Sequence, residues 1–210
     1  WRPRTRRPSH TNSVPESHMI ELGPEPAEQD SMTSPVRTQM KLRQLRSDDM
    51  YGGRHEIIDL HVDASLSLPE ALDQICNQAE EAVKNGKLIM MLSDRYLDKD
   101  KLPVHALLAT GAVHQHLVRK GLRCDANIIV DTGVARDPHH CACLSGYGAT
   151  AVYPYLVYQS LHDIAQRGNI DRQQQLGRSF RRGVRKGLFK VMSKMGISSI
   201  SSYRGAQLFE

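Results

Sequence analysis

The chain has 210 residues, of which 40% are hydrophobic and 24% charged, and its formal net charge is +5. A chain of this length can bury a sizeable core, and this composition is typical of soluble globular proteins. No apolar run approaches the roughly 18 to 20 residues that cross a bilayer, and no apolar segment follows the basic N-terminus. The sequence therefore predicts neither a membrane protein nor a secretory signal.

The first 50 residues contain many prolines and little apolar periodicity. We expect a linker or extended, partly disordered segment there, with one short helix over 39–46. Its basic residues lie among Pro, Ser and Glu, and a second basic excess covers 172–194. Such stretches are most often solvated, so nucleic-acid binding is not predicted. Because the chain starts at Trp1 and stops at Glu210 inside sequence that reads as structured, we expect a fragment of a longer protein.

From Ile57 onward, strand signals alternate with helix signals. The four predicted strands cover residues 57–62, 87–92, 126–130 and 149–153. The helices that follow them begin after Ser67, Pro103, Asp137 and Pro154. Ser67 and Glu70 have the spacing of a capping box. Asp137–Pro138 combines an acidic N-cap with proline at the first helical position, which marks a helix start.

The helical spacing of apolar residues predicts which side chains face the core. In the helix after Ser67 these are Leu72, Ile75, Cys76, Ala79, Ala82 and Val83. In the helix that ends at Arg119 they are Val104, Leu107, Leu108 and Leu117. Serial βα units with short connections form a parallel sheet with right-handed crossovers. We therefore predict an α/β fold of four consecutive βα units, either half-barrel-like or a small doubly wound sheet.

A long helix is predicted over 171–195. Its apolar stripe consists of Leu176, Phe180, Val184, Leu188, Val191, Met192 and Met195. Its other face carries Arg178, Arg181, Arg182, Arg185, Lys186 and Lys190. Such a helix can bind a membrane surface or a partner, but we favour a helix packed on the domain with a solvated basic face. Gly196 ends it, and the segment that follows has no strong local signal.

Polar residues follow the predicted strands, at the edge where parallel α/β folds bind their ligands. They are Asp63, Ser93–Asp94–Arg95, Asp131–Thr132–Gly133 and Tyr153–Pro154. Two interpretations are open. The residues form a polar cleft for a small ligand, or the acids cap the following helices while Asp94 and Arg95 order a loop.

The sequence contains no Walker A loop, G-x-G-x-x-G, G-x-S-x-G or H-E-x-x-H motif. The four cysteines lack the spacing of a disulfide framework, so we expect free thiols. They are Cys76, Cys124, Cys141 and Cys143. The run from His139 to Cys143 lacks the paired knuckles of a metal site, and adjacent Cys and His rarely form a nucleophile pair. His114 and His116 face different directions on a helix. We predict no catalytic, cofactor or metal residue.

Several strings resemble the large subunit of glutamate synthase. They are Leu92–Arg95, Pro103–His114, His116–Arg123, Asp131–Arg136 and Gly146–Leu156. The most specific block is Lys186–Ser198, followed by Ile200–Gln207 and Phe209–Glu210. The resemblance extends from about Asp59 to the C-terminus and is weak before Ser34. Cys141 and Cys143 stand where the family usually has bulkier apolar residues, which favours packing over metal ligation.

The resemblance implies the end of the family's central domain over 51–170 and the start of its FMN-binding TIM-barrel domain over 171–210. It implies an enzyme that makes two glutamates from glutamine, 2-oxoglutarate and a reductant, with ammonia passing through an internal tunnel. FMN and an iron–sulfur cluster are implied for the full-length enzyme, and no cofactor for this fragment. Electrons would come through a small subunit or from ferredoxin, in the cytoplasm or a plastid.

The resemblance implies that the fragment is a scaffold between the amidotransferase and FMN domains. It also implies that the fragment is inactive alone and forms part of the tunnel wall. The expected inter-domain or tunnel contacts are Ser93, Asp94, Arg95, Asp131, Thr132, Lys194, Ser201, Tyr203 and Arg204. The alternative is a free-standing α/β module that binds a small anion through Arg95 and the loops at the strand ends.

Overall fold

The computed structural model describes residues 35–36, 53–96, 98–168 and 173–206, which belong to one compact unit, Pro35–Glu210. The linker predicted over 1–50 lies outside the described residues except for Pro35 and Val36, and so does its short helix. None of the helices in the described ranges is long and apolar enough to cross a membrane.

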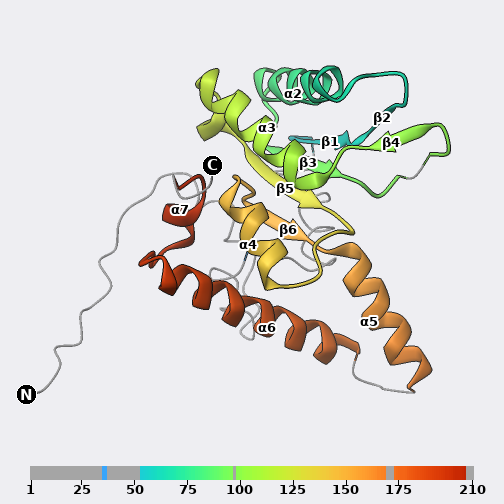
Figure 1. Ribbon diagram of the computed structural model, residues 1–210, viewed down its shortest axis with the longest axis vertical. Coiled ribbons are helices and arrows are strands. Elements are labelled where there is room, and N and C mark those ends of the chain that lie inside the picture. Colours follow the sequence, from blue (N-terminus) through green and yellow to red (C-terminus); the bar gives the residue numbers. More distant parts are fainter. Residues whose placement is uncertain (1–34, 37–52, 97, 169–172, 207–210) are drawn as a thin grey trace, which may run out of the picture. The chain divides into compact units, whose positions relative to one another are not determined.

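Four parallel strands form the central sheet, which confirms the predicted sheet (Figure 1). In chain order they are β1 (His55–Asp59), β3 (Ile89–Ser93), β5 (Asn127–Asp131) and β6 (Ala151–Tyr153). They are neighbours in that same order, and Val36 forms a parallel bridge to Val152 of β6. A doubly wound sheet reverses its strand order at a switch point. The uninterrupted order therefore agrees with the half-barrel-like alternative.

The crossover helices pack against one face of this sheet. They are α2 (Leu68–Lys84), α3 (Ala106–Arg119) and α4 (Pro138–Gly146), and a further helix, α5 (Tyr155–Arg167), follows β6. Met90 and Leu92 on β3 and Ile128 and Val130 on β5 belong to the main core cluster with the helices. Because successive strand side chains point to opposite faces, the residues between them lie on the other side of the sheet.

The helix starts predicted at Ser67 and Asp137 are confirmed by their caps. The Glu70 carboxylate accepts hydrogen bonds from the N–H (2.9 Å) and the hydroxyl (2.7 Å) of Ser67, at the start of α2. The Asp137 carboxylate accepts one from the His140 N–H (2.9 Å), at the start of α4. The predicted inward residues of α2 are buried, except Leu72, which is half-buried.

The strand predicted over 57–62 is wrong in its second half. β1 ends at Asp59, and the next residues form β2 (His61–Asp63), which pairs antiparallel with β4 (Lys101–Pro103). The Asp59 carboxylate is hydrogen-bonded to the His61 N–H (3.0 Å) and to His61 Nδ1 (2.7 Å). Local side-chain bonds of this kind compete with a strand ladder. All three residues of β4 are exposed, so no apolar pattern marks this strand in the sequence.

Two side chains predicted to face the core are exposed. Leu108 is 42% exposed, because α3 begins only at Ala106 and buries a different stripe. That stripe consists of Ala106, Ala109, Thr110, Val113 and Leu117. Met195 is 41% exposed, because the last long helix ends at Lys194 and Met195 leaves its apolar face.

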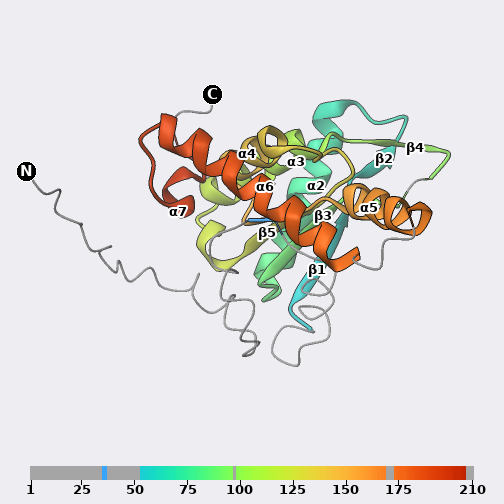
Figure 2. The ribbon, with the colours of Figure 1, turned by 90° about the horizontal axis from the view of Figure 1, so that it is seen from below.

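The long helix α6 (Gln173–Lys194) packs on α4 and α5, which confirms the prediction of a packed helix (Figure 2). Its fully buried side chains are Val184, Leu188 and Met192. Its exposed basic side chains are Arg178, Arg182, Lys186, Lys190 and Lys194. A short helix, α7 (Ile200–Tyr203), follows, and its Tyr203 packs with Leu188 and Met192 in a second core cluster.

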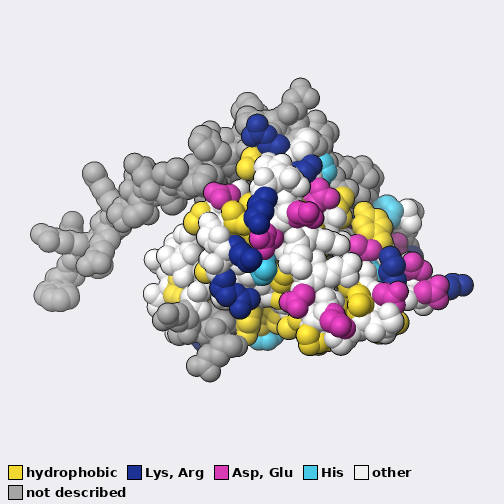
Figure 3. All heavy atoms as spheres, turned by 90° about the horizontal axis from the view of Figure 1, so that it is seen from above, with side chains coloured by type: hydrophobic (Ala, Val, Ile, Leu, Met, Phe, Trp, Pro, Cys, Tyr) yellow, Lys and Arg dark blue, Asp and Glu magenta, His cyan; other side chains and the backbone are white. Residues whose placement is uncertain are grey.

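Glu80 ties α2 to α3 at the surface. Its carboxylate contacts Lys84 Nζ (2.6 Å), His116 Nε2 (2.6 Å) and Lys120 Nζ (3.4 Å). The hydrogen bonds from Lys84 and His116 are the main reason that the pKa of Glu80 is lowered to about 2. The face above α2 in Figure 1 carries mixed charge, with Lys and Arg gathered toward one side and Asp and Glu toward the other (Figure 3).

Glu80→Gln should lower the melting temperature at pH 7, because folding stabilises the charged form of Glu80. The pKa of Glu80 lies below the ordinary value of 4.5, so this stabilisation is complete above pH 4.5 and is lost as the pH falls toward 2. Thermal unfolding of both proteins from pH 7 to pH 2 should therefore converge in acid. Glu81→Gln, at an exposed neighbouring position, is the control. A difference that stays constant over this range would contradict the assignment.

Gly187 is the point at which α6 approaches α4. A Cβ atom added there would lie 2.4 Å from Cβ of Pro138, whose ring cannot move aside. We expect Gly187→Ala to lower the free energy of unfolding by about 1–3 kcal/mol, the usual cost of overpacking. Gly183 on the same helix has no atom within 4 Å of such a Cβ, so Gly183→Ala should raise it by up to about 1 kcal/mol. Urea unfolding measures both, and a stabilising Gly187→Ala would contradict the close contact.

Candidate functional site

A row of side chains crosses the carboxyl ends of the parallel strands. Asp59, Ser93, Asp131 and Tyr153 are register partners on successive strands, from β1 to β6. Residues paired in register project to the same face of a sheet. The structure therefore brings together three of the strand ends that the sequence singled out, with Asp59 beside them, on the face opposite the crossover helices.

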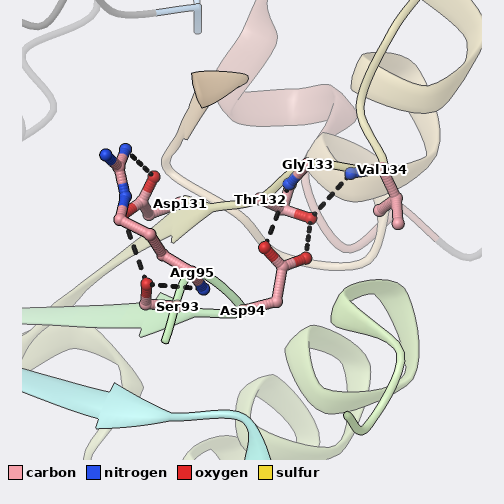
Figure 4. A network of polar contacts seen from close by, with 7 residues as sticks. All are labelled: Ser93, Asp94, Arg95, Asp131, Thr132, Gly133 and Val134. Carbon is pink, nitrogen blue, oxygen red and sulfur yellow. Dashed lines mark hydrogen bonds and ion pairs between the residues drawn. The ribbon is translucent and has the colours of Figure 1, made fainter. Parts of the chain in front are cut away.

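The centre of the row is an ion pair between Arg95 and Asp131 (Figure 4). Arg95 Nε donates to Asp131 Oδ2 (3.1 Å) and Arg95 Nη2 donates to Asp131 Oδ1 (3.0 Å). The Ser93 hydroxyl donates to Asp131 Oδ2 (3.2 Å). The Asp131 side chain is 2% exposed and the Arg95 side chain 31%. A two-pronged pair of this geometry fixes both the position and the plane of the guanidinium group.

The same guanidinium group lies over two tyrosine rings. Arg95 Cζ lies 4.4 Å from the centroid of the Tyr155 ring and 5.6 Å from that of Tyr153. Burial opposes the charge of Arg95, but the hydrogen bonds and negative charge of Asp131 outweigh it, so the pKa of Arg95 is raised. Arg95 is therefore held by a buried carboxylate and by cation–π contacts with two aromatic rings.

Asp94 orders the loop that follows β5 (Figure 4). Its carboxylate accepts hydrogen bonds from the Thr132 hydroxyl and from the Gly133 N–H (3.0 Å). Thr132 Oγ1 in turn accepts from the Val134 N–H (3.2 Å). Burial, and after it the charge of Asp94, raises the pKa of the nearby Tyr155 hydroxyl to about 12. These contacts agree with the loop-ordering interpretation of Asp94, because it stabilises a loop and caps no helix.

Asp63, the other strand-end acid, takes no part in this cluster. It lies on β2, and its carboxylate accepts hydrogen bonds from the N–H (2.8 Å) and the hydroxyl (2.7 Å) of Ser65. These local bonds lower the pKa of Asp63. The division of β1 and β2 therefore separates this acid from the row.

The remaining predicted contact residues lie elsewhere in the structure. Lys194 and Ser201 are exposed, at the end of α6 and on α7. Tyr203 is buried in the second core cluster. Arg204 Nε donates to the Ala149 carbonyl (3.2 Å), which precedes β6 at the amino end of the sheet. The predicted residues thus form two groups, at opposite ends of the parallel strands.

Two residues with extensive contacts at these groups are not among the predicted site residues. Tyr155 follows Pro154, and a Cβ at Gly133 would lie 3.0 Å from its hydroxyl, so glycine leaves room for the ring. Arg123, in the short helix η3 (Arg123–Asp125), contacts His114 at the amino end of the sheet. No local sequence motif marks either residue: Arg95, over the Tyr155 ring, is distant in the chain, and Arg123 reaches His114 only because η3 folds back beside α3.

The cysteines do not form a reactive or metal-binding centre in the described residues. All four are free, and burial raises the pKa of Cys141 to about 12. Cys143 Sγ lies 3.6 Å from His139 Nε2, but burial also raises the pKa of Cys143. No group of three His, Cys, Asp or Glu side chains is placed to hold a metal ion within the described ranges. His114 and His116 contact different partners, Arg123 and Glu80, as their spacing predicts.

Comparison with known proteins gives a consistent result. The family model of the glutamate synthase central domain matches residues 9–210. The ferredoxin-dependent glutamate synthase, chloroplastic, of Oryza sativa subsp. japonica is 37% identical over 210 residues, which cover 92% of this chain and 13% of that protein. The glutamate synthase [NADPH] large chain of Bacillus subtilis (strain 168) is 44% identical over 147 residues, which cover 70% of this chain and 10% of that protein.

Among solved structures, a flavocytochrome b2 variant with sulfite bound matches 83% of this chain and 51% of its own, at 14% identity and a TM-score of 0.49. So low a score carries no argument about fold or function. The sequence relatives are much longer than this chain, which spans about 13% of the length of the first of them. The extent of the family match and the identity to these relatives show that the chain belongs to the glutamate synthase central domain family.

Proposed function

We propose that the chain is part of a glutamate synthase large chain, in an enzyme that makes two glutamates from glutamine, 2-oxoglutarate and a reductant. Membership of the central domain family supports this. The relatives' names suggest the reductant, either ferredoxin or NADPH, the latter acting through a small subunit. The protein would work in the cytoplasm, or in a plastid as the name of the rice relative suggests. The proposed domain boundaries at about 50 and 170 stay predictions.

We infer a scaffold role for the chain itself, between the amidotransferase and FMN domains and in the wall of an ammonia tunnel. The observation that carries this role is the fixed position of Arg95. Its guanidinium group donates two hydrogen bonds to Asp131, and its Cζ atom lies over the Tyr155 ring; we call this arrangement the Arg95 clamp. A cation already neutralised by a buried carboxylate gives shape and rigidity, and it attracts a further anion only weakly. This favours a positioning surface over an anion-binding module.

The hydrogen bonds of the cluster suit a tunnel wall. Ammonia both donates and accepts hydrogen bonds, so it is retained where wall groups lack partners. Here Asp131 accepts from Ser93, Asp94 accepts from the Thr132 hydroxyl, and Thr132 Oγ1 accepts from the Val134 N–H, so these polar groups already have partners. Such a surface can exclude bulk water and border a passage without trapping the solute that moves along it. Ser93, Asp94, Arg95, Asp131 and Thr132 are the proposed lining residues.

The cofactors implied for the full-length enzyme do not fit the buried cysteines or the strand-end cluster of this chain. An iron–sulfur cluster needs thiolate ligands, and burial raises the pKa of Cys76, Cys141 and Cys143. At the strand-end cluster, the phosphate of FMN would need a cation that is available, and Arg95 already holds Asp131. We therefore assign both groups to other parts of the longer protein.

Arg95→Ala in the full-length enzyme tests the scaffold role. It removes the partner of a carboxylate that is almost fully buried, which disturbs the surrounding surface. We expect less glutamate formed per glutamine hydrolysed, by about tenfold if the loss of order costs about 1.4 kcal/mol, with ammonia released to solution. Glutaminase and glutamate-synthesis assays on the same sample measure this ratio. Arg204→Ala tests the second group of predicted contacts in the same way.

Two further variants make this test decisive. Arg95→Lys keeps the charge but not the two-pronged geometry, so it should lower the ratio of glutamate formed to glutamine hydrolysed by less than Arg95→Ala does. It replaces Arg95→Ala in this test if that variant does not fold. Arg119→Ala, at an exposed arginine on α3, should leave the ratio unchanged. If folded Arg95→Ala couples the two half-reactions as well as the Arg119→Ala control does, the scaffold role is wrong.

Calorimetry separates the scaffold from the alternative of a small-anion module. We expect the purified 210-residue chain to give no binding heat with glutamate, 2-oxoglutarate or FMN at millimolar concentration, because Asp131 already occupies the Arg95 guanidinium. Circular dichroism of the same sample shows whether the chain is folded. Saturable binding that Arg95→Ala abolishes would support the alternative and contradict the scaffold.

A further inference from the structure

A second polar cluster lies at the amino end of the sheet, around Arg123. Arg123 Nε donates to His114 Nδ1 (2.9 Å), Nη1 donates to the Ala126 carbonyl (2.7 Å) and Nη2 donates to the Gly148 carbonyl (2.8 Å). One guanidinium group therefore joins α3, the start of β5 and the end of α4. Because an arginine N–H can only donate, His114 Nδ1 must present its lone pair in this arrangement.

The C-terminal segment rests on the other side of the His114 ring. A Cβ at Gly205 would lie 3.0 Å from His114 Nε2, and one at Gly148 would lie 2.4 Å from the same ring. Both glycines have positive φ angles, of 65° and 114°, which side chains rarely adopt. The imidazole is thus in close contact with two backbone segments that are far apart in sequence.

Two hydrogen bonds complete the docking of this segment. The Gly205 N–H donates to the Gly146 carbonyl (2.8 Å), and Arg204 Nε donates to the Ala149 carbonyl (3.2 Å). Gly146 is the last residue of α4, and Ala149 lies in the short connection from α4 to β6. The turn after α7 is therefore fixed by backbone acceptors on one side and by the His114 ring on the other.

We propose that His114 is a positioning residue: its neutral ring, oriented by Arg123, is the seat on which Arg204 and Gly205 dock. It thereby sets where the polypeptide after α7 continues. The wider consequence rests on the proposed function, in which that polypeptide is the next domain of the same enzyme. The local docking stands on the contacts described above and does not depend on the enzyme's activity.

Protonation of His114 should weaken the docking of Arg204 and Gly205 on its ring. A proton on Nδ1 would replace the acceptor with a donor that faces the Arg123 Nε–H, and it would add a cation beside the charged groups that face the ring, Arg123 from η3 and Arg204 after α7. Burial and then these two arginines lower the pKa of His114 from 6.5 to about 4. The docked state therefore binds fewer protons than the open state. Docking is complete above pH 6.5 and weakens as the pH falls toward 4.

Hydrogen exchange of residues 199–206 in the full-length protein tests this proposal. Undocking removes Arg204 and Gly205 from the ring but leaves Arg123, so the pKa of His114 in the open state lies between about 4 and 6.5, and linkage makes docking weaker at pH 5 than at pH 7.5 by up to about thirtyfold. Protection of these amides, corrected for the intrinsic rate at each pH, should fall accordingly. His114→Gln keeps an acceptor for Arg123 but does not titrate, so it should remain protected at both pH values.

His116→Gln is the matched control, since this residue lies on the same helix but contacts Glu80. It should keep the wild-type pH response in residues 199–206. Unchanged wild-type protection between pH 7.5 and pH 5 would overturn the proposal, even if His114→Gln does not fold. An equal response in folded His114→Gln would also overturn it. Glutamate synthesis is assayed separately, so a failure of the proposed function is seen independently of this result.

Discussion

Parallel pairing in register is the constraint on which the rest of the structure depends. It places Asp59, Ser93, Asp131 and Tyr153 side by side, although about 35 residues of chain separate the first two. The crossover helices cover one face of the sheet, so the polar row projects from the other. Because every strand runs in the same direction, its carboxyl end contributes to one cluster and its amino end to another. The Arg95 clamp and the His114 seat are the products of this single arrangement.

The elements that can be predicted from the sequence are those stabilised by nearby residues. The caps at Ser67 and Asp137 act over three or four positions, and the apolar stripe of α6 repeats at helical spacing, so both are evident in the amino-acid pattern. β2 and β4 are not, because their pairing depends on the turn at Asp59 and on no apolar alternation. α7 is also absent from the predicted elements, because its stability comes from Tyr203 packing on α6, a contact that no local pattern indicates.

The residues of the candidate site also divide into those that the sequence predicts and those that it does not. Strand-end positions indicate that Ser93, Arg95 and Asp131 lie at one edge, but not that Arg95 binds Asp131, which is 36 residues away. The Tyr155 ring can lie beneath the Arg95 guanidinium group because glycine at position 133 leaves room for it. The seat at the amino end is beyond prediction, because His114 and Gly205 come together only when α3, α4 and the last turn are all in place.

The pairing of Arg95 with Asp131 has an electrostatic consequence. A lone buried cation has a field that falls off slowly and draws counter-ions from solution, whereas a cation and a carboxylate about 3 Å apart act as a dipole whose field decays within a few ångströms. The Arg95–Asp131 pair would therefore neither attract nor repel a charged solute strongly, whereas the Asp94 carboxylate, whose partners Thr132 and Gly133 are neutral, keeps its negative charge.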